Sequence, residues 1–199
     1  MRGWFRQSRP GSAAGSRRRG ILLLAAAILS VGCQGGGAWR CPPRPIHLQP
    51  GDELPDLTAM ALDGGTVDLR QITDGKVAVI DIWASWCGPC LAAIPHLQAL
   101  QNRYRGRGFT VVGVMVDRNA SRIGAAVAEQ RGIRYPVLAD DDGQAVNCAW
   151  GYPLGIPTMV LVGRDGKVVE VYRGTVGIAA IQRRVEELMR AAPATETSS

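Results

Sequence analysis

The chain has 199 residues, of which 46% are hydrophobic, enough for one domain of ordinary size with a full core. Its net charge of +6 comes from the N-terminus, because six arginines and no acidic residue precede residue 33. The rest has 17 basic and 17 acidic residues. That balance excludes the basic surface of a nucleic-acid-binding protein, so no nucleic-acid partner is expected.

The first segment, residues 1–33, has the pattern of an export signal. Arginines precede Ile21–Val31, an apolar run too short to span a bilayer but typical of a signal peptide. Ser30-Val31-Gly32-Cys33 resembles a bacterial lipobox, which makes Cys33 a lipidation candidate and attaches the N-terminus to the membrane. Ser30 departs from the aliphatic residue usual there, and ordinary cleavage or an uncleaved anchor is the alternative. Each version places the domain on the periplasmic side of a bacterial membrane.

Three segments follow the signal. Residues 34–50 are rich in Gly and Pro and predict a flexible linker. Residues 51–191 form the expected domain, and residues 192–199 have no pattern and predict a disordered tail. The domain opens with two short strands, Leu57–Leu62 and Thr66–Leu69, around an Asp-Gly-Gly turn that predicts a β-hairpin.

Strands and helices then alternate. The run Val77–Ile82 predicts a buried strand, and Leu91–Tyr104 a helix that buries Ile94, Leu97, Leu100 and Tyr104. The later expected elements are a buried strand Phe109–Val116, a helix Ser121–Arg131, a short strand Pro136–Ala139, a short helix carrying Cys148, a hairpin of Thr158–Val162 and Lys167–Tyr172, and a helix Gly177–Met189. In the helix Ser121–Arg131, Ser121 is the expected N-cap, and Ile123, Ala126 and Val127 should face inward. The order predicts an α/β fold, a mixed sheet with helices on both faces and an N-terminal hairpin.

The turn between the first buried strand and its helix carries Cys87-Gly88-Pro89-Cys90. The unpaired N–H groups at a helix N-terminus favour a thiolate, so Cys87 should be exposed and acidic. Pro89 suits the first helical turn because it needs no N–H partner. Cys90 lies one turn away and can close a disulfide. Half of a zinc site and a stapled loop are the alternatives for an isolated CxxC.

The motif resembles the thioredoxin active site, with Trp86 before it, Trp83 in the strand and Pro95 in the helix. Thioredoxins carry a cis-proline in the segment that matches Gly155-Ile156-Pro157-Thr158. Pro50-Gly51, Gly75-Lys76 and Asp165-Gly166-Lys167 narrow the resemblance to the TlpA/ResA type. That type is a membrane-anchored thioredoxin with a Glu three residues after the second cysteine. Here that position is Ala93, so any role of that carboxylate is absent or carried elsewhere.

The resemblance implies a thioredoxin fold and a thiol-disulfide oxidoreductase. It implies cysteine-containing protein substrates, such as apocytochrome c or copper-site cysteines, and a membrane thiol reductase as electron donor. The Gly-Pro dipeptide is that of thioredoxin, which favours a reductant over an oxidant. We expect no cofactor beyond the Cys87–Cys90 disulfide and no metal site.

The resemblance also implies site roles. Cys87 is the expected nucleophile, Cys90 the resolving thiol and Asp81, a lone acid in an apolar strand, the proton acceptor. The alternative for Asp81 is a solvent-facing strand end. Ile156 and Pro157 would lie beside the cysteines and pair with an extended substrate. The expected substrate surface includes Trp86, Gly88 and Pro89, although Trp86 is equally compatible with a place in the core.

Two cysteines remain, Cys41 and Cys148. In an oxidising compartment a leftover pair suggests a structural disulfide, and two thiols, with Cys148 a small buried hydrophobe, are the alternative.

Two other functions compete with the oxidoreductase. Peroxiredoxins place Pro seven and Thr three residues before their reactive cysteine, whereas this chain has Ile80 and Ala84 there, which argues against a peroxidase. A copper metallochaperone of this fold uses CxxxC and a downstream His, whereas this chain has CxxC and no His after His96.

Overall fold

The computed structural model describes residues 47–151, 155–175 and 177–191. Seven strands form one sheet in the order β2-β1-β5-β4-β3-β6-β7. The strands are β1 (Thr58–Ala61), β2 (Thr66–Asp68), β3 (Val77–Trp83), β4 (Phe109–Met115), β5 (Val137–Ala139), β6 (Thr158–Val162) and β7 (Val168–Arg173). The helices are α1 (Leu69–Thr73), α2 (Gly88–Tyr104), α3 (Ala120–Gln130), the 3-10 turn η1 (Asp141–Gly143), α4 (Gln144–Trp150) and α5 (Ile178–Arg190).

The centre of the sheet is the pair β3 and β4. They run parallel from Val77↔Phe109 to Trp83↔Met115, and β6 pairs antiparallel on the other side of β3. All seven residues of each central strand are buried. Strands covered on both faces are apolar at nearly all positions rather than at alternate ones, and this pattern predicted both strands.

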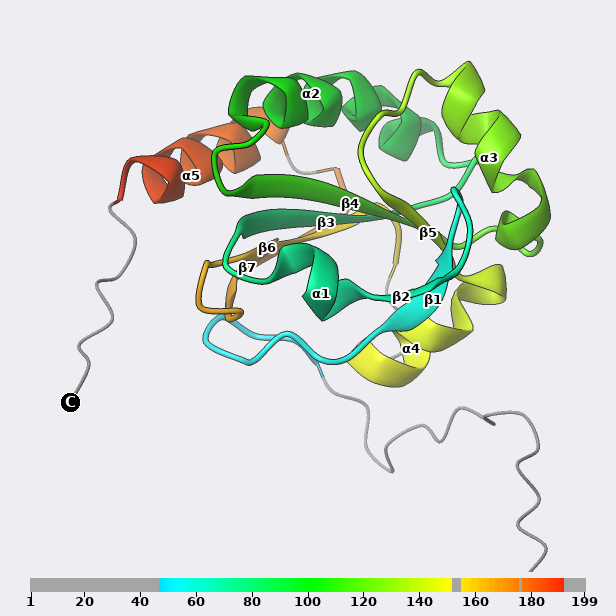
Figure 1. Ribbon diagram of the computed structural model, residues 1–199, viewed down its shortest axis with the longest axis horizontal. Coiled ribbons are helices and arrows are strands. Elements are labelled where there is room, and N and C mark those ends of the chain that lie inside the picture. The colour runs from blue at the N-terminus through cyan, green and yellow to red at the C-terminus, as the bar shows by residue number, and fades with distance from the viewer. Residues whose placement is uncertain (1–46, 152–154, 176, 192–199) are drawn as a thin grey trace, which may run out of the picture. The chain divides into compact units, whose positions relative to one another are not determined.

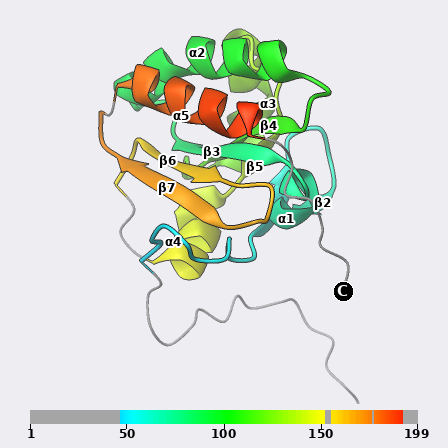
Figure 2. The ribbon, with the colours of Figure 1, turned by 90° about the vertical axis from the view of Figure 1, so that its left-hand side faces the viewer.

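Helices cover both faces of the sheet, as the sequence predicts. Figures 1 and 2 show α2 and α5 on one face and α1 and α4 on the other. The side chains of β3 alternate between two core clusters: Val77 and Val79 pack with α2 and α5, and Ala78 and Ile80 with α1 and α4. We call the first of these the α2 face. The side chain of any odd-numbered β3 residue therefore points to the α2 face, where the two cysteines lie.

The prediction for α3 is wrong in two details. The N-cap is Asn119, and the Ser121 N–H and hydroxyl both donate to the Asp141 carboxylate instead, at 2.8 and 2.7 Å. Ala126 is exposed, and Gly124 is buried in its place. A Cβ at Gly124 would come within 2.6 Å of Leu62 Cδ2, so close packing against the loop after β1 determines which face of this helix turns inward.

The end of the expected linker packs on the domain. Leu48 is 1% exposed and belongs to the core cluster on the α1 and α4 face. Its carbonyl accepts a hydrogen bond from Arg173, and Gly51 N–H donates to the Val168 carbonyl at 2.8 Å. The segment from Leu48 to Gly51 is thereby attached to β7.

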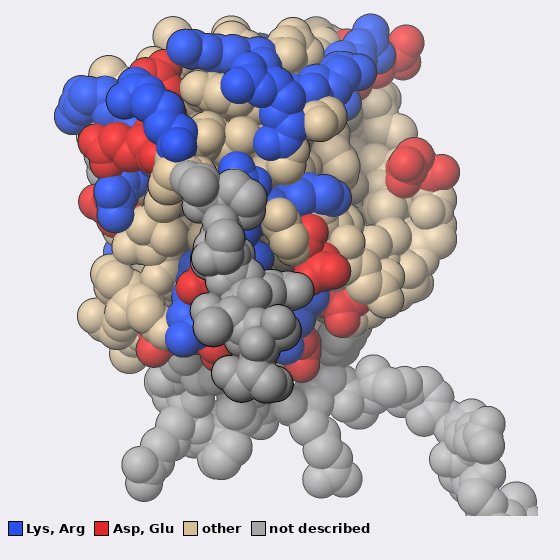
Figure 3. All heavy atoms as spheres, turned by 60° about the vertical axis from the view of Figure 1, so that its left-hand side comes forward, with Lys and Arg blue, Asp and Glu red and all other residues tan. Residues whose placement is uncertain are grey.

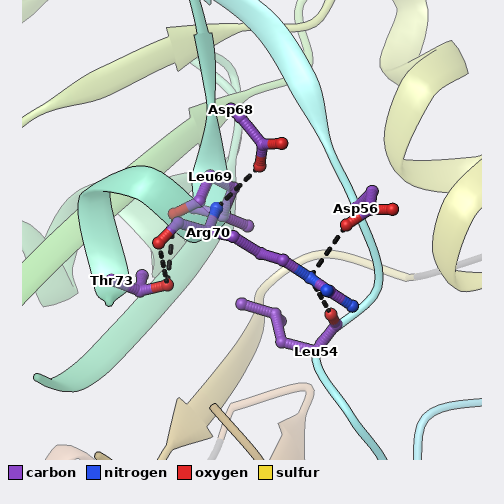
Figure 4. A network of polar contacts seen from close by, with 6 residues as sticks. All are labelled: Leu54, Asp56, Asp68, Leu69, Arg70 and Thr73. Carbon is purple, nitrogen blue, oxygen red and sulfur yellow. Dashed lines mark hydrogen bonds and ion pairs between the residues drawn. The ribbon is translucent and has the colours of Figure 1, made fainter. Parts of the chain in front are cut away.

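Arg70 attaches the start of α1 to the segment before β1 (Figure 4). Its Nε donates to the Leu54 carbonyl and lies 2.8 Å from an Asp56 carboxylate oxygen. The Asp68 side chain caps α1 by accepting from Arg70 N–H at 2.8 Å. Because Arg70 and Asp56 are both largely exposed, their ion pair adds little stability, and the hydrogen bonds are the stronger part of this contact.

The surface carries both signs of charge. Figure 3 shows basic side chains gathered along the upper rim, in the layer of α2 and α5, with acidic side chains beside them. Arg103 of α2 pairs with Glu186 of α5 at 2.7 Å. This mixed surface agrees with the neutral balance of the sequence after its first 33 residues.

Three predicted segments lie outside the described residues, wholly or in large part: the signal segment with Cys33, most of the linker with Cys41, and the tail 192–199. Within the described residues, no helix is both long and apolar enough to cross a membrane.

Candidate active site

The two cysteines of the CxxC motif form a disulfide at the start of α2. Cys87 and Cys90 are joined at an S–S distance of 2.01 Å, with their Cα atoms 5.3 Å apart. Cys87 is the N-cap of the helix, and its Sγ accepts a hydrogen bond from the Cys90 backbone N–H at 3.3 Å. In the reduced protein the same N–H and the helix N-terminus favour the Cys87 thiolate.

The two sulfur-bearing residues differ in exposure less than the sequence predicts. Cys87 is 6% exposed and Cys90 0%, so Cys87 is the accessible one but is not the open residue that we expected. Its Sγ is bonded to that of the fully buried Cys90. The exposed surface around it consists of Trp86, at 71%, with Gly88 and Pro89. Trp86 therefore lies outside the core, whereas Trp83 lies fully inside it.

Asp117 holds the turn that precedes Cys87, a role that the sequence analysis missed. Its buried carboxylate accepts hydrogen bonds from the Ser85 N–H at 2.8 Å and the Ser85 hydroxyl at 2.6 Å. In the sequence, Asp117 directly follows the apolar run Phe109–Val116. An acidic residue just after a predicted central strand could therefore have pointed to this role. Because the carboxyl ends of parallel β3 and β4 meet at one edge, these two residues come together.

The cis-proline segment lies beside the cysteine turn, as the thioredoxin resemblance implies. The Ile156–Pro157 peptide bond is cis. Pro157 and Pro89 both line a cleft of about 310 Å³, which Ala92 and Ala93 of α2 and Ile178 of α5 extend. All the residues that line this cleft within the described chain are uncharged, and Ala93 stands where the resembling family carries its Glu. The cleft can accept an apolar group next to the disulfide.

Asp81 is fully buried, which makes the solvent-facing alternative wrong. Its odd number in β3 places it on the α2 face with Val79 and Trp83. Burial raises its pKa from 3.8 to about 7. Neither carboxylate oxygen has a hydrogen-bond partner within the described residues. A carboxyl group with this pKa accepts or releases a proton near neutral pH, which is what a general acid–base group requires.

Cys148 lies in α4, away from the α2 face, and is itself engaged in a disulfide. Its expected partner Cys41 lies outside the described residues, so the Cys41–Cys148 pairing stays a prediction. No group of three or more His, Cys, Asp or Glu side chains within the described chain is arranged to hold a metal ion.

Comparisons with known proteins agree with this geometry. A sequence profile of the Redoxin family matches residues 49–182. The thiol-disulfide oxidoreductase ResA of Bacillus thuringiensis (strain Al Hakam) is 32% identical over 124 residues, which cover 62% of this chain and 69% of that protein. ResA of Geobacillus thermodenitrificans is 28% identical over 140 residues, 69% of this chain and 77% of that protein.

Solved structures show the same fold. A thiol:disulfide interchange protein of the thioredoxin family from Chlorobium tepidum TLS superposes with a TM-score of 0.59 at 28% identity, covering 71% of this chain and 97% of that one. A thiol:disulfide interchange protein from Bacteroides sp. superposes with a TM-score of 0.61 at 25% identity, covering 75% and 96%. The chain therefore belongs to the Redoxin family, as a thioredoxin-fold thiol-disulfide oxidoreductase related to ResA.

Proposed function

We propose that this protein is an exported reductant that opens disulfides in cysteine-containing proteins on the periplasmic side of a bacterial membrane. The observation that carries the chemistry is Asp81: a fully buried carboxyl, with a pKa of about 7, on the sheet face that α2 covers. A dithiol that must release a buried proton near neutral pH needs such a group.

The reaction has two exchange steps. The Cys87 thiolate attacks one sulfur of the substrate disulfide, the substrate S–S bond breaks, and the departing substrate thiolate takes up a proton. Cys90 then gives its proton to Asp81 and attacks Cys87 Sγ, which breaks the mixed disulfide and expels the second substrate thiolate; this thiolate takes up a proton from solvent, and Asp81 returns its own proton to solvent. The substrate gains two electrons and two protons, and the enzyme ends with the Cys87–Cys90 disulfide that the structure contains.

The substrate surface consists of Trp86, Gly88 and Pro89, with Ile156 and Pro157 across the cleft. An extended peptide paired along the Ile156 backbone would bring its cysteine to Cys87. The uncharged cleft beside Pro89 favours an apolar residue next to that cysteine. Cysteines of apocytochrome c or of copper sites are the substrates that the resemblance implies.

Export and electron supply complete the proposal. Lipidation of Cys33 would attach the N-terminus to the membrane and keep the domain near a membrane thiol reductase that restores the dithiol. No cofactor beyond the Cys87–Cys90 pair takes part in the proposed cycle.

Asp81→Asn tests the chemistry. Reduced protein reacts with Ellman's reagent in two stages: Cys87 releases one thionitrobenzoate as the mixed disulfide forms, and Cys90 releases the second. The variant should slow only the second release, by ~10²–10⁴-fold at neutral pH, because only that stage needs Cys90 to lose its proton to Asp81. Equal rates for the second release in both proteins would remove Asp81 from the mechanism.

A redox equilibrium tests the direction. Incubated with a glutathione buffer, the Cys87–Cys90 pair of a reductant is oxidised at potentials near that of thioredoxin, about −270 mV. A potential near that of DsbA, about −120 mV, would make the protein an oxidant and contradict the proposal. Asp63→Asn, at an exposed turn between β1 and β2, is the matched control for both assays.

A further inference from the structure

Two aromatic rings meet beside Asp81, over a glycine. Gly113 of β4 is the register partner of Asp81 in β3, so both positions belong to the same face of the sheet. A Cβ at Gly113 would lie 2.9 Å from Trp83 Nε1 and 3.4 Å from Tyr135 Cε2. Since neighbouring strands are about 4.8 Å apart, Trp83 and Tyr135 occupy the space directly next to the Asp81 side chain.

All three side chains at this place have buried polar atoms that make no hydrogen bond within the described part of the chain. The two Asp81 carboxylate oxygens, Trp83 Nε1 and the Tyr135 hydroxyl are each shielded from solvent and make no hydrogen bond to another described residue. Buried polar groups in folded proteins are almost always paired, because an unpaired one loses its hydration without compensation. Two donors and one acceptor around a single glycine are complementary, so they can satisfy one another.

We propose that Tyr135 and Trp83 are positioning residues for Asp81. Their O–H and N–H groups donate to the Asp81 carboxylate, directly or through one bridging water above Gly113, when Asp81 ionises to accept the Cys90 proton. The expected effect of these two residues on the rate of the Cys90 step rests on the proposed function of Asp81. Their expected effect on the pKa of Asp81 does not depend on that function.

The residues beside Asp81 come from the two neighbouring strands, the start of α2 and the segment before β5. In the described chain, β4 contributes Gly113 and β6 contributes Met159 as the register partners of Asp81. The start of α2 contributes Cys87 and Cys90 as the titratable groups of the same core cluster. Tyr135, two residues before β5, adds a titratable hydroxyl whose pKa the Asp81 carboxylate raises.

The direction of the effect follows from the protonation states. Burial, and secondarily the Asp81 carboxylate, raise the pKa of Tyr135, so its hydroxyl stays protonated and remains a donor. Trp83 Nε1 is a donor at every pH. Donors stabilise the ionised carboxylate, so removing one raises the pKa of Asp81 and moves the pH at which Cys90 is activated upward.

The experiment titrates Asp81 directly in the reduced protein, by NMR of a carbon-13 label in the aspartate carboxyl groups, assigned with Asp81→Asn. In Tyr135→Phe the Asp81 midpoint should rise by about 1 to 2 pH units, the value of one hydrogen bond to a charged group. Tyr104→Phe, which changes another buried tyrosine at the far end of α2, should leave the midpoint unchanged. Trp83→Phe should raise it in the same direction as Tyr135→Phe.

Kinetics supply the second readout. The pH profile of the second thionitrobenzoate release should move upward in Tyr135→Phe, and in an Asp81→Asn background Tyr135→Phe should have no further effect. An unchanged Asp81 midpoint in both Tyr135→Phe and Trp83→Phe would overturn the proposal. If Asp81→Asn leaves the second release unchanged while Tyr135→Phe still shifts the Asp81 titration, the proposed function fails and the positioning role of Tyr135 stands.

Discussion

Replacing Asp81 with Asn should make the stability of the oxidised protein less sensitive to pH. Asp81 is fully buried, and its pKa rises from 3.8 to about 7 on folding. Between these two values the folded protein binds a proton that the unfolded chain has released. The free energy of unfolding of the wild type therefore falls as pH rises from about 4 to about 7, and levels off above.

The size of this effect follows from the same pKa values. At about 1.4 kcal/mol for each pKa unit, the difference between 3.8 and about 7 corresponds to ~4 kcal/mol of lost stability above neutral pH. Asn carries no titrating proton, so Asp81→Asn lacks this loss. Relative to the wild type, the variant should gain ~4 kcal/mol between about pH 4 and pH 8, whatever its stability at either pH alone.

Urea unfolding at a series of pH values measures the difference, with the Cys87–Cys90 disulfide intact in both proteins. Asp63→Asn, at an exposed turn, is the control and should retain the pH dependence of the wild type. Parallel curves for the wild type and Asp81→Asn would refute the reasoning, because they would mean that Asp81 ionises as easily in the folded protein as in the unfolded chain.

Three further predictions concern other parts of the chain. Iodoacetamide should label Cys87 of the reduced protein before Cys90 near neutral pH, because Cys87 has the helix N-terminus and the remaining exposure; labelling of Cys90 first would reverse the assigned roles. Leu48→Ala should lower the free energy of unfolding by ~2–5 kcal/mol, since Leu48 is in the core; a loss well under 1 kcal/mol would mean that it is not held there. Peptide mapping of the oxidised protein should find Cys41 joined to Cys148, and an iodoacetamide-labelled Cys41 would contradict that pairing.

The central part of the fold and the reacting groups follow from local sequence. A short run of mainly apolar, β-branched residues favours a strand covered on both faces, and Val77–Trp83 is such a strand, with Asp81 its one acidic residue. A CxxC at the start of an amphipathic segment has to place Cys87 at the N-cap and Cys90 one turn later, because 3.6 residues make a helical turn. The thioredoxin resemblance of the segment around Pro157 predicted a cis peptide bond beside the cysteines, and the Ile156–Pro157 bond is cis.

Other features depend on which segments meet. Ser121 lost its expected capping role because Asp141, twenty residues later, accepts from both of its donors. Leu48 looked like part of a linker because nothing in its neighbours shows that β7 lies beside it. The strand pattern showed that Asp81 is an exception, but only the covering by α2 made it fully buried and raised its pKa.

The surroundings of Asp81 show most clearly what tertiary structure determines and local sequence does not. Gly113 and Tyr135 lie 32 and 54 residues after Asp81, and neither stands out in its own segment. The parallel register of β3 and β4 puts Gly113 next to Asp81, and the absent side chain admits the Trp83 and Tyr135 rings. Local sequence determined which groups react, because helix and strand periods act over a few residues. Tertiary packing decided the environment that tunes them, because burial and hydrogen-bond donors come from whichever segments the sheet brings together.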